Sequence, residues 1–304
     1  MDPSDPDPTP PAPDLAAALD HAAELLAQAD ALIVAAGAGM GIDSGLPDFR
    51  GNEGFWKAYP ALGRARIDFY GAASPDTFHR RPGLAWGFYG HRLALYRATA
   101  PHAGFGILKR WGEGMLQGVR VFTSNVDGQF QKAGFDAEAV HECHGSIHHL
   151  QCLGPCSDAI WPADAFVPDV DDDACLLRNA PPTCPRCGGL ARPNILMFGD
   201  GGWVDDRESA QSDRLRRWLA QVSRPVVVEL GAGTAVPTVR RFSHAVVQQL
   251  GGRLVRINLR EPAVPSPLDV GLPMGALAAL QALDARLNQA TRRQSGLDLS
   301  LIHI

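Results

Sequence analysis

The sequence predicts an α/β protein in which a Rossmann-like, doubly wound parallel sheet carries a smaller lobe. Apolar runs that end in turn residues recur along the chain, as fully buried parallel strands do. Helical patterns separate these runs, and alternation of this kind places a parallel sheet between two layers of helices. The smaller lobe follows from two long stretches that interrupt the alternation.

The alternation begins with an Ala- and Leu-rich helix at residues 15–29, which leads into the apolar run ALIVAAGAG at 31–39. Helical spacing returns at residues 103–111 and 209–222, between later apolar runs. Those later runs predict three more buried strands, at VRVFTSN (119–125), PVVVELGAG (225–233) and GRLVRINLRE (252–261).

The two interruptions predict the smaller lobe. Residues 55–99 are rich in aromatic side chains at helical spacing, whereas residues 151–192 carry Pro, Cys and an acidic triplet with little periodicity. We therefore predict one folded domain at 14–290, whose small lobe is formed by these two segments. The large lobe takes the rest of the domain, residues 14–54, 100–150 and 193–290.

Both ends of the chain are predicted to lie outside that domain. Residues 1–13 alternate Pro with Asp and Ser, and they cannot bury enough apolar surface to offset their ordering entropy, which predicts disorder. Residues 291–304 are interpreted as a tail. Its end, LSLIHI at 299–304, matches the translation of a transposon end used to prepare sequencing libraries, which indicates an assembly artefact. The alternative is a natural tail.

Composition narrows the class of function. Apolar residues make up 45% of the 304 residues and charged residues 20%, as in an ordinary globular domain. The formal charge of −5 gives no general attraction to nucleic acid or anionic lipid, so neither is expected as a direct partner. No apolar run reaches the length of a membrane span, and the N-terminus lacks a signal-peptide pattern. We therefore expect a cytoplasmic protein whose cysteines are reduced or bind metal.

A glycine-rich turn follows the first predicted strand. Gly37, Ala38 and Gly39 lie where the strand passes into a helix, so backbone N–H groups and the positive end of a helix dipole meet there. Such a point suits a pyrophosphate, and glycine lets the chain approach it closely. A tight turn without a ligand uses similar residues, so the turn alone leaves both interpretations open.

The loop that follows, SGLPDFRG, places a carboxylate, an aromatic ring and a guanidinium together at Asp48, Phe49 and Arg50. This is a costly arrangement to hold without a ligand. The string from 34 to 51 resembles the signature of the sirtuin family. The resemblance covers about residues 15–290, because further motifs follow in the family's order: TSNVDG (123–128), HECHGS (141–146), RPNILMFGD (192–200), GAGTAVP (231–237) and INLRE (257–261).

The resemblance implies an enzyme that uses NAD. It implies that the glycine turn and the loop at 48–50 bind the phosphates of NAD and cover the side where nicotinamide lies. Asn125 and Asp127 are the implied contacts of the nicotinamide carboxamide and its ribose. Without the resemblance, Asn125 and Asp127 fit equally well as helix-capping or turn residues. The other implied NAD contacts are Ser124, Gly231, Ala232 and, at the adenosine ribose, Asn258.

Several positions depart from the family pattern. Gly41 stands in place of Ser, Ser124 in place of Gln, and Asp200 in place of Glu, while the loop at 231–237 lacks the usual Gly-Thr-Ser. Because several of these positions lie in the implied NAD-facing loops, they leave the substrate and the outcome of the reaction open.

His144 is the candidate general base. A histidine titrates near neutral pH and can accept a proton from a ribose hydroxyl, which is the role the resemblance implies at this position. We expect the following Gly145 to keep the imidazole accessible. A lone histidine is more often structural, and His141, His148 and His149 lie nearby, but only His144 directly precedes glycine.

Four cysteines have the spacing of a zinc knuckle. The pair Cys184 and Cys187, in CPRCGG, has the tight turn that a knuckle needs, and it pairs with Cys152 and Cys156. The sequence thus predicts one structural zinc ion, which makes the smaller lobe zinc-binding as well as helical. The first pair is one residue wider than the family's usual spacing, so a degenerate site stays open. Cys143 and Cys175 are interpreted as ordinary buried thiols.

Two further motifs concern the substrate. Tyr89-x-x-Arg92 resembles the pair with which some sirtuins recognise succinyl and malonyl lysine, and arginine suits a planar carboxylate. The alternative is a core tyrosine and a surface arginine one helical turn apart. The resemblance also implies that an extended peptide pairs its backbone with the loop formed by Phe198, Gly199 and Asp200.

The resemblance therefore implies an NAD-dependent protein-lysine deacylase that acts on acylated-lysine proteins and releases nicotinamide and O-acyl-ADP-ribose. Retention of His144 favours this activity. Two alternatives stay open: a protein ADP-ribosyltransferase or NAD glycohydrolase on the same fold, and a catalytically silent NAD- or partner-binding module.

Overall fold

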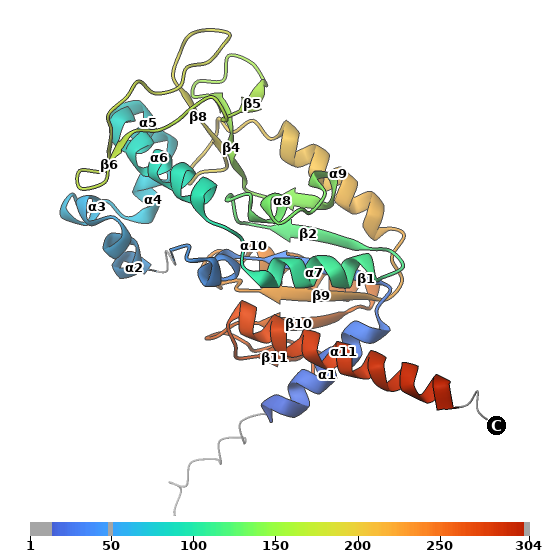
Figure 1. The fold of residues 1–304 in the computed structure, drawn as a ribbon. Helices are drawn as coiled ribbons and strands as arrows, with labels where there is room; N and C mark the ends of the chain where they lie inside the picture. The colour runs from blue at the N-terminus through green and yellow to red at the C-terminus, as the bar shows by residue number, and fades with distance from the viewer. Residues whose placement is uncertain (1–13, 48–50, 301–304) are drawn as a thin grey trace, which may run out of the picture.

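A parallel sheet forms the centre of the molecule, as predicted (Figure 1). The computed structural model describes residues 14–47 and 51–300. Within these residues the large sheet has six parallel strands in the order β11-β10-β9-β1-β2-β3. Their bounds are β1 (Ala31–Ala36), β2 (Val119–Thr123), β3 (Val140–Glu142), β9 (Pro225–Leu230), β10 (Arg253–Ile257) and β11 (Val270–Leu272).

The predicted apolar runs form strands, and these strands are apolar because helices cover both faces of the sheet. Along β1, Leu32 and Val34 point into one core and Ile33 and Ala35 into another. Side chains on successive residues of a strand point to opposite faces, so a strand between two helical layers is apolar at every position. The four predicted strands correspond to β1, β2, β9 and β10.

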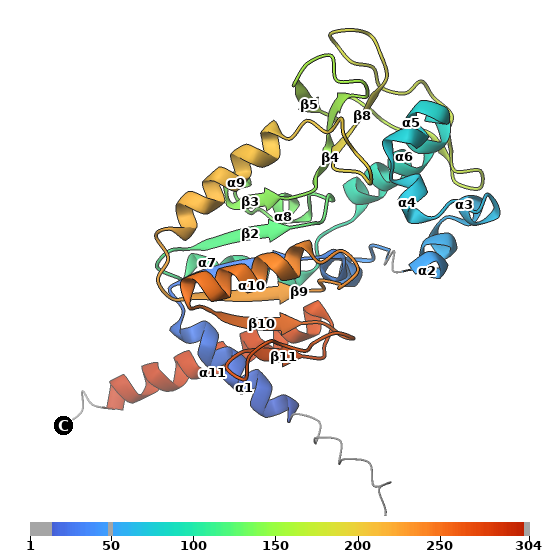
Figure 2. The same ribbon diagram turned by 180° about the vertical axis from the view of Figure 1, so that it is seen from behind.

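Helices cover the two faces in separate layers. One layer lies in front of the sheet in Figure 1, and the other is seen in Figure 2. The first layer consists of α1 (Leu15–Gln28), α7 (Ala103–Glu113) and α11 (Ala276–Ser300), and the second of α9 (Asp206–Leu219) and α10 (Thr238–Leu250). Helix α11 continues into the segment that the sequence analysis assigned to a tail. None of the described helices is both long and apolar enough to cross a membrane.

The order of the strands fixes where a ligand can bind. From β1 the chain runs through β2 to β3, at one edge of the sheet. After the smaller lobe it returns to β9, on the other side of β1, and continues through β10 to β11 at the opposite edge. The direction therefore reverses between β1 and β9. In open α/β sheets the crevice at the carboxyl ends of such a strand pair is the usual ligand site.

The smaller lobe lies beside the β2 and β3 edge of the large sheet and has its own core (Figure 1). Aromatic side chains fill that core, as the helical spacing at 55–99 predicts. Its helices are α2 (Gly51–Ala58), α3 (Pro60–Arg64), α4 (Phe69–Ala72), α5 (Pro75–Arg80) and α6 (Pro82–Ala98), and its strands are β4 (Gly145–Cys152), β5 (Ile160–Pro162), β6 (Val170–Asp171), β7 (Leu176–Leu177) and β8 (Ala191–Ile195).

Strands β4 and β8 join the two lobes. They pair antiparallel within the small-lobe sheet, and each crosses a lobe boundary that we drew from the sequence, at residue 150 for β4 and at residue 193 for β8. The remaining short elements, η1 (Ala38–Ser44), α8 (Gln129–Lys132) and η2 (Ala137–Ala139), lie in connections of the large lobe.

Candidate active site

Two glycine loops meet at the carboxyl ends of β1 and β9. A Cβ atom at Gly37 would lie 2.9 Å from Ala232 Cα, and one at Gly231 would lie 2.3 Å from Gly39 Cα. Gly231 also has a φ of +59°, which disfavours other residues. Gly39 N donates a hydrogen bond to Gly231 O at 3.1 Å. The glycines are therefore required by the contact between the loops, which leaves only backbone at the point where a phosphate is expected.

The chain leaves this contact as a 3₁₀ helix, η1, which begins at Ala38 after Gly37. No side chain caps its first turn, and backbone carbonyls accept from two of its N–H groups: Gly39 N donates to Gly231 O at 3.1 Å and Met40 N to Gly37 O at 3.0 Å. The other part of the signature, Asp48, Phe49 and Arg50, lies outside the described residues, and its predicted contacts with NAD stay predictions.

Asn125 ties the loop after β2 to the first glycine loop. Its Nδ2 donates to Gly37 O at 3.0 Å, and its backbone N–H donates to Thr123 Oγ1 at 3.0 Å. The neighbouring Ser124 N donates to Ala36 O at 3.1 Å. The ends of β1 and β2 are thus joined by side-chain and backbone hydrogen bonds, and Asn125 lies at the carboxyl edge of the sheet, where the sequence places it.

Asp127 is buried in the same loop, with only 8% of the residue exposed. Its Oδ1 accepts a hydrogen bond of 3.0 Å from Gln129 N, as a turn or capping aspartate does. Burial raises the pKa of this carboxyl to about 6, and the Gln129 hydrogen bond opposes that rise. Asp127 therefore has a structural contact, and its affinity for a proton is unusually high for an aspartate.

His144 lies just past the end of β3 and is partly exposed. Burial lowers the pKa of its imidazole below the ordinary value, while a hydrogen bond with the backbone of Ser124 and the charge of Glu208 act in the opposite direction. The neutral form, which can accept a proton, is therefore favoured at pH 7. This brings the candidate base next to the loop that carries Asn125.

Backbone conformation and close packing explain why position 145 is a glycine. Its φ is +77°, and a Cβ atom there would lie 2.1 Å from Asn194 O on β8. Glycine is needed because β4 and β8 pair closely at this point, and the expected access to the imidazole stays a prediction.

Two of the neighbouring histidines, His141 and His148, have other partners. His141 Nε2 lies 2.5 Å from Glu208 Oε1, and His148 Nε2 donates to Asp127 O at 2.9 Å. Burial lowers the pKa of His149 to about 4, and its Nδ1 has no hydrogen-bond partner among the described residues. These contacts favour His144 as the candidate base.

Asn258 closes the far side of the glycine loops. It is almost fully buried, its Nδ2 donates to Ala232 O at 2.9 Å, and its Oδ1 accepts from Glu261 N at 3.0 Å. The side chain therefore holds the β9 and β10 loops together. Its predicted contact with an adenosine ribose stays a prediction.

Arg240 and Glu261 are residues of this region that the sequence analysis missed. Arg240 Nε donates to Ala232 O at 3.0 Å, and its Nη2 donates to Glu261 O at 2.9 Å. Thr234 Oγ1 donates to Glu261 Oε1 at 2.7 Å. No local motif signals such a network, because its members come from α10 and from the loops after β9 and β10.

Tyr89 and Arg92 lie on α6, and both are buried. Arg92 is 8% exposed, so the alternative of a surface arginine is wrong. Its guanidinium carbon lies 5.7 Å from the centre of the Tyr89 ring. Burial raises the pKa of Tyr89 to about 12, so the phenol is neutral in the physiological range. The two side chains are together, as the spacing along a helix predicts.

Asp200 forms a buried ion pair within the predicted peptide loop. Its two carboxylate oxygens accept from Arg192 Nη1 at 2.6 Å and from Nη2 at 2.9 Å, and neither side chain is exposed. Asp200 Oδ1 also accepts from Gly202 N at 3.1 Å. The carboxylate therefore fixes the shape of the loop, and a peptide that pairs here would use the backbone of the loop.

The rest of that loop lies against α4. Phe198 N donates to Ala73 O at 3.0 Å, and the Phe198 ring lies 4.2 Å from the ring of Tyr70, centre to centre. Gly199 has a φ of +67°, which turns the chain after Phe198. Tyr70 is half exposed, so the loop has an aromatic surface beside it.

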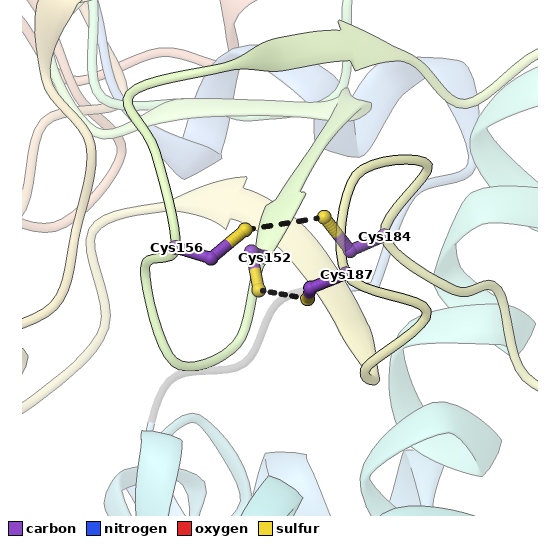
Figure 3. Close-up of side chains that lie close together, drawn as sticks. All are labelled: Cys152, Cys156, Cys184 and Cys187. Carbon is purple, nitrogen blue, oxygen red and sulfur yellow. Dashed lines mark hydrogen bonds between the residues drawn. The ribbon is translucent and has the colours of Figure 1, made fainter.

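Four cysteine thiols of the smaller lobe converge (Figure 3). All the Sγ atoms lie within 4.8 Å of one another, with Cys152 and Cys187 at 3.7 Å and Cys156 and Cys184 at 3.6 Å. Thiolates in a tetrahedral zinc site, each about 2.3 Å from the metal, are about 3.8 Å apart. The donor set and its spacing fit one structural zinc ion with a closed shell, and the wider first spacing does not prevent it.

The other two cysteines lie outside this cluster. Cys175 is buried, as predicted, and burial raises its pKa to about 12. Cys143 is partly exposed, although burial of its thiol also raises its pKa. Both are therefore protonated and poorly nucleophilic.

Known proteins support the assignment that these motifs suggest. The model of the Sir2 family matches residues 37–215. NAD-dependent protein deacylase 2 of Pyrobaculum aerophilum is 30% identical over 278 residues, which cover 91% of this chain and 99% of that protein. The NAD-dependent protein deacylase of Aeropyrum pernix is 33% identical, with 86% of this chain and 95% of that protein covered.

A solved Sir2 homolog–NAD complex has the same fold, with a TM-score of 0.67 and 24% identity over 88% of this chain and 93% of that one. The chain therefore belongs to the Sir2 family, the sirtuins.

Proposed function

We propose that this protein is an NAD-dependent protein-lysine deacylase. The observation that carries the proposal is the meeting of the Gly37 and Gly231 loops with Asn125 at the switch point of the sheet, next to His144. The relatives named above are NAD-dependent protein deacylases, and they align with most of this chain.

The glycine loops fit the phosphates of NAD. Cβ atoms at Gly37 and Gly231 would collide with the backbone of the opposite loop, so backbone atoms line the contact. We assign the phosphates to Gly37, Ala38, Gly39, Gly231 and Ala232, and the ribose of the adenosine to Asn258. NAD would supply a ribose carbon that the acyl oxygen attacks as nicotinamide leaves. The acyl group would then pass to a ribose hydroxyl of ADP-ribose, and water would release the free lysine.

The residues after β2 and β3 supply the remaining roles. Asn125 and Asp127 orient the nicotinamide carboxamide and ribose, with Ser124 beside them. His144 accepts the proton of a ribose hydroxyl, and its lowered pKa leaves the imidazole neutral and ready to do so at pH 7. The substrate peptide pairs along the loop of Phe198 and Gly199, whose shape the buried Asp200 maintains.

The buried Arg92 supports a dicarboxylic acyl group on the substrate lysine, such as succinyl or malonyl. A carboxylate that reaches the guanidinium next to Tyr89 would be bound away from water, where a charge-assisted hydrogen bond is strong. We also infer a cytoplasmic location, because a reducing compartment keeps the cluster thiols available to zinc.

The test is nicotinamide release from NAD by purified protein, with acetyl-, succinyl- and malonyl-lysine peptides and a control without peptide. The mass of each peptide is followed in the same reactions. We expect peptide-dependent release with a matching loss of acyl mass, and faster turnover of the succinyl or malonyl peptide. Release without loss of acyl mass would contradict the deacylase and would indicate an ADP-ribosyltransferase or an NAD glycohydrolase. NAD binding without any release would indicate a silent binding module.

A further inference from the structure

Tyr96 holds one edge of the Arg92 guanidinium. It lies one helical turn beyond Arg92 on α6, and its hydroxyl oxygen accepts hydrogen bonds from Arg92 Nε at 3.0 Å and from Nη2 at 2.8 Å. Both side chains are buried. Two donors of a planar group that converge on one oxygen fix the plane as well as the position of that group.

Aromatic rings enclose the same guanidinium. Its carbon lies 5.3 Å from the ring centres of Phe88 and Tyr96 and 5.7 Å from that of Tyr89, within the range of cation–π attraction. Burial raises the pKa of the Tyr96 phenol, so the phenol is neutral at pH 7. The hydrogen bonds to Tyr96 therefore orient Arg92 without cancelling its positive charge.

Tyr96 is itself attached to the large lobe. Gln129 is buried at the start of α8, and its Nε2 donates to Tyr96 O at 3.4 Å and to Thr99 O at 3.3 Å. The backbone N–H of the same Gln129 donates to Asp127 Oδ1 at 3.0 Å. A continuous set of hydrogen bonds thus runs from the loop of Asp127, through Gln129 and Tyr96, to Arg92.

We propose that Tyr96 is a positioning residue for acyl specificity: it sets the orientation in which Arg92 presents its guanidinium to the carboxylate of a dicarboxylic acyl-lysine, relative to the loop that carries Asp127. The inference deepens the proposed function, because it rests on the role given there to Arg92. Tyr96 lies outside the Tyr89-x-x-Arg92 motif, and its hydroxyl accepts both of these hydrogen bonds from Arg92.

The experiment compares kcat and KM for succinyl- and acetyl-lysine versions of one peptide, with saturating NAD. The variant Tyr96→Phe keeps the ring and the cation–π contact but removes the oxygen that Arg92 binds. Because hydrogen bonds to charged groups contribute substantially, we expect KM for the succinyl peptide to rise by roughly tenfold. The kcat for that peptide and both constants for the acetyl peptide are expected to stay within about twofold of wild type. The control is Ser243→Ala, which removes a buried hydroxyl that donates to Val239 O within α10, and it is expected to leave the selectivity unchanged.

Two further variants separate the possible outcomes. Arg92→Met tests the proposed function itself, and it should abolish the preference for the succinyl peptide. Arg92→Lys keeps the charge but cannot make both hydrogen bonds to Tyr96, so it should raise the succinyl KM even if Tyr96→Phe folds poorly. If Tyr96→Phe lowered kcat/KM equally for both peptides, or changed it for neither, the positioning role would be overturned. If wild type shows no preference and Arg92→Met changes nothing, the role of Arg92 falls, and the inference about Tyr96 falls with it.

Discussion

Asn125 Nδ2 donates a 3.0 Å hydrogen bond to Gly37 O and so joins the loops that follow β2 and β1. Gly37 itself is in contact with the loop after β9, where an added Cβ would lie 2.9 Å from Ala232 Cα. Asn125 therefore fixes the loop after β1, which in turn packs against the loop after β9. Its side chain serves the proposed NAD site by fixing the glycine loop as well as by any contact with the ligand.

Asn125→Asp should separate these loops. The change keeps the shape of the side chain, but it places a carboxylate oxygen against Gly37 O in place of a donor. We expect kcat/KM for NAD to fall by roughly 100-fold or more. Asn179→Asp is the matched control, because Asn179 Nδ2 donates to Val167 O at 2.9 Å on the surface of the smaller lobe. Equal activity of the two variants would contradict the proposed arrangement.

His144→Ala should remove the general base. General-base catalysis contributes roughly 10²- to 10⁴-fold, so deacylation, measured by the loss of acyl mass from the peptide, should fall by that factor. Cleavage of NAD to nicotinamide is expected to fall less. His79→Ala, at an exposed position of α5, is the control and should retain full activity. Full deacylation by His144→Ala would refute this role.

Asp127→Asn should make the folded protein more stable at neutral pH while it impairs NAD turnover. Burial raises the pKa of Asp127 to about 6 in the folded state, above its ordinary value of 3.8. The contribution of this group to stability is thus fully present below pH 3.8 and is lost as pH rises through about 6. Asparagine carries no charge to bury, and its Oδ1 can still accept from Gln129 N.

The difference in the free energy of unfolding between Asp127→Asn and wild type should therefore depend on pH. The gain in the free energy of unfolding should be small near pH 4 and reach roughly 2 to 3 kcal/mol above pH 7. Denaturant unfolding at several pH values measures it. A gain that does not change between pH 4 and pH 8 would show that the charge of Asp127 is not its cause.

The parts of this site that were predictable come from short, continuous segments. The strands β1 and β9 have apolar runs because both of their faces are buried, and the glycine loops follow them directly. The convergence of Cys152 and Cys156 with the later pair was also predictable, since zinc knuckles have fixed spacing.

Other parts depend on contacts between distant segments. Strands β3 and β11 have three residues each, too few to show a periodic pattern. The packing reason for Gly145 was not predictable, because its close neighbour Asn194 lies on β8, far along the chain. The hydrogen bonds of Arg240 to Ala232 and Glu261 likewise join α10 to the loops after β9 and β10, and no local pattern marks them.

Loss of zinc should destabilise the smaller lobe. We expect one zinc ion per chain in the purified protein, measured by elemental analysis, and almost none in Cys156→Ser. Because metal binding contributes directly to folding, this variant or a strong chelator should lower the melting temperature by roughly 5 °C or more. Cys143→Ser, which changes a thiol outside the cluster, should keep its zinc. Wild-type protein whose melting is unaffected by loss of the metal would contradict a structural role.

Gly231→Ala should disrupt the proposed NAD site by forcing the backbones of the two glycine loops apart. The added Cβ would lie 2.3 Å from Gly39 Cα, at a φ of +59°, so the two glycine loops must separate. We expect the free energy of unfolding to fall by roughly 2 kcal/mol and KM for NAD to rise at least about tenfold. Gly83→Ala is the control: nothing lies within 4 Å of its added Cβ on α6, so KM should not change, and stability should rise by up to about 1 kcal/mol. A Gly231→Ala variant with wild-type KM would show that NAD does not bind against these loops.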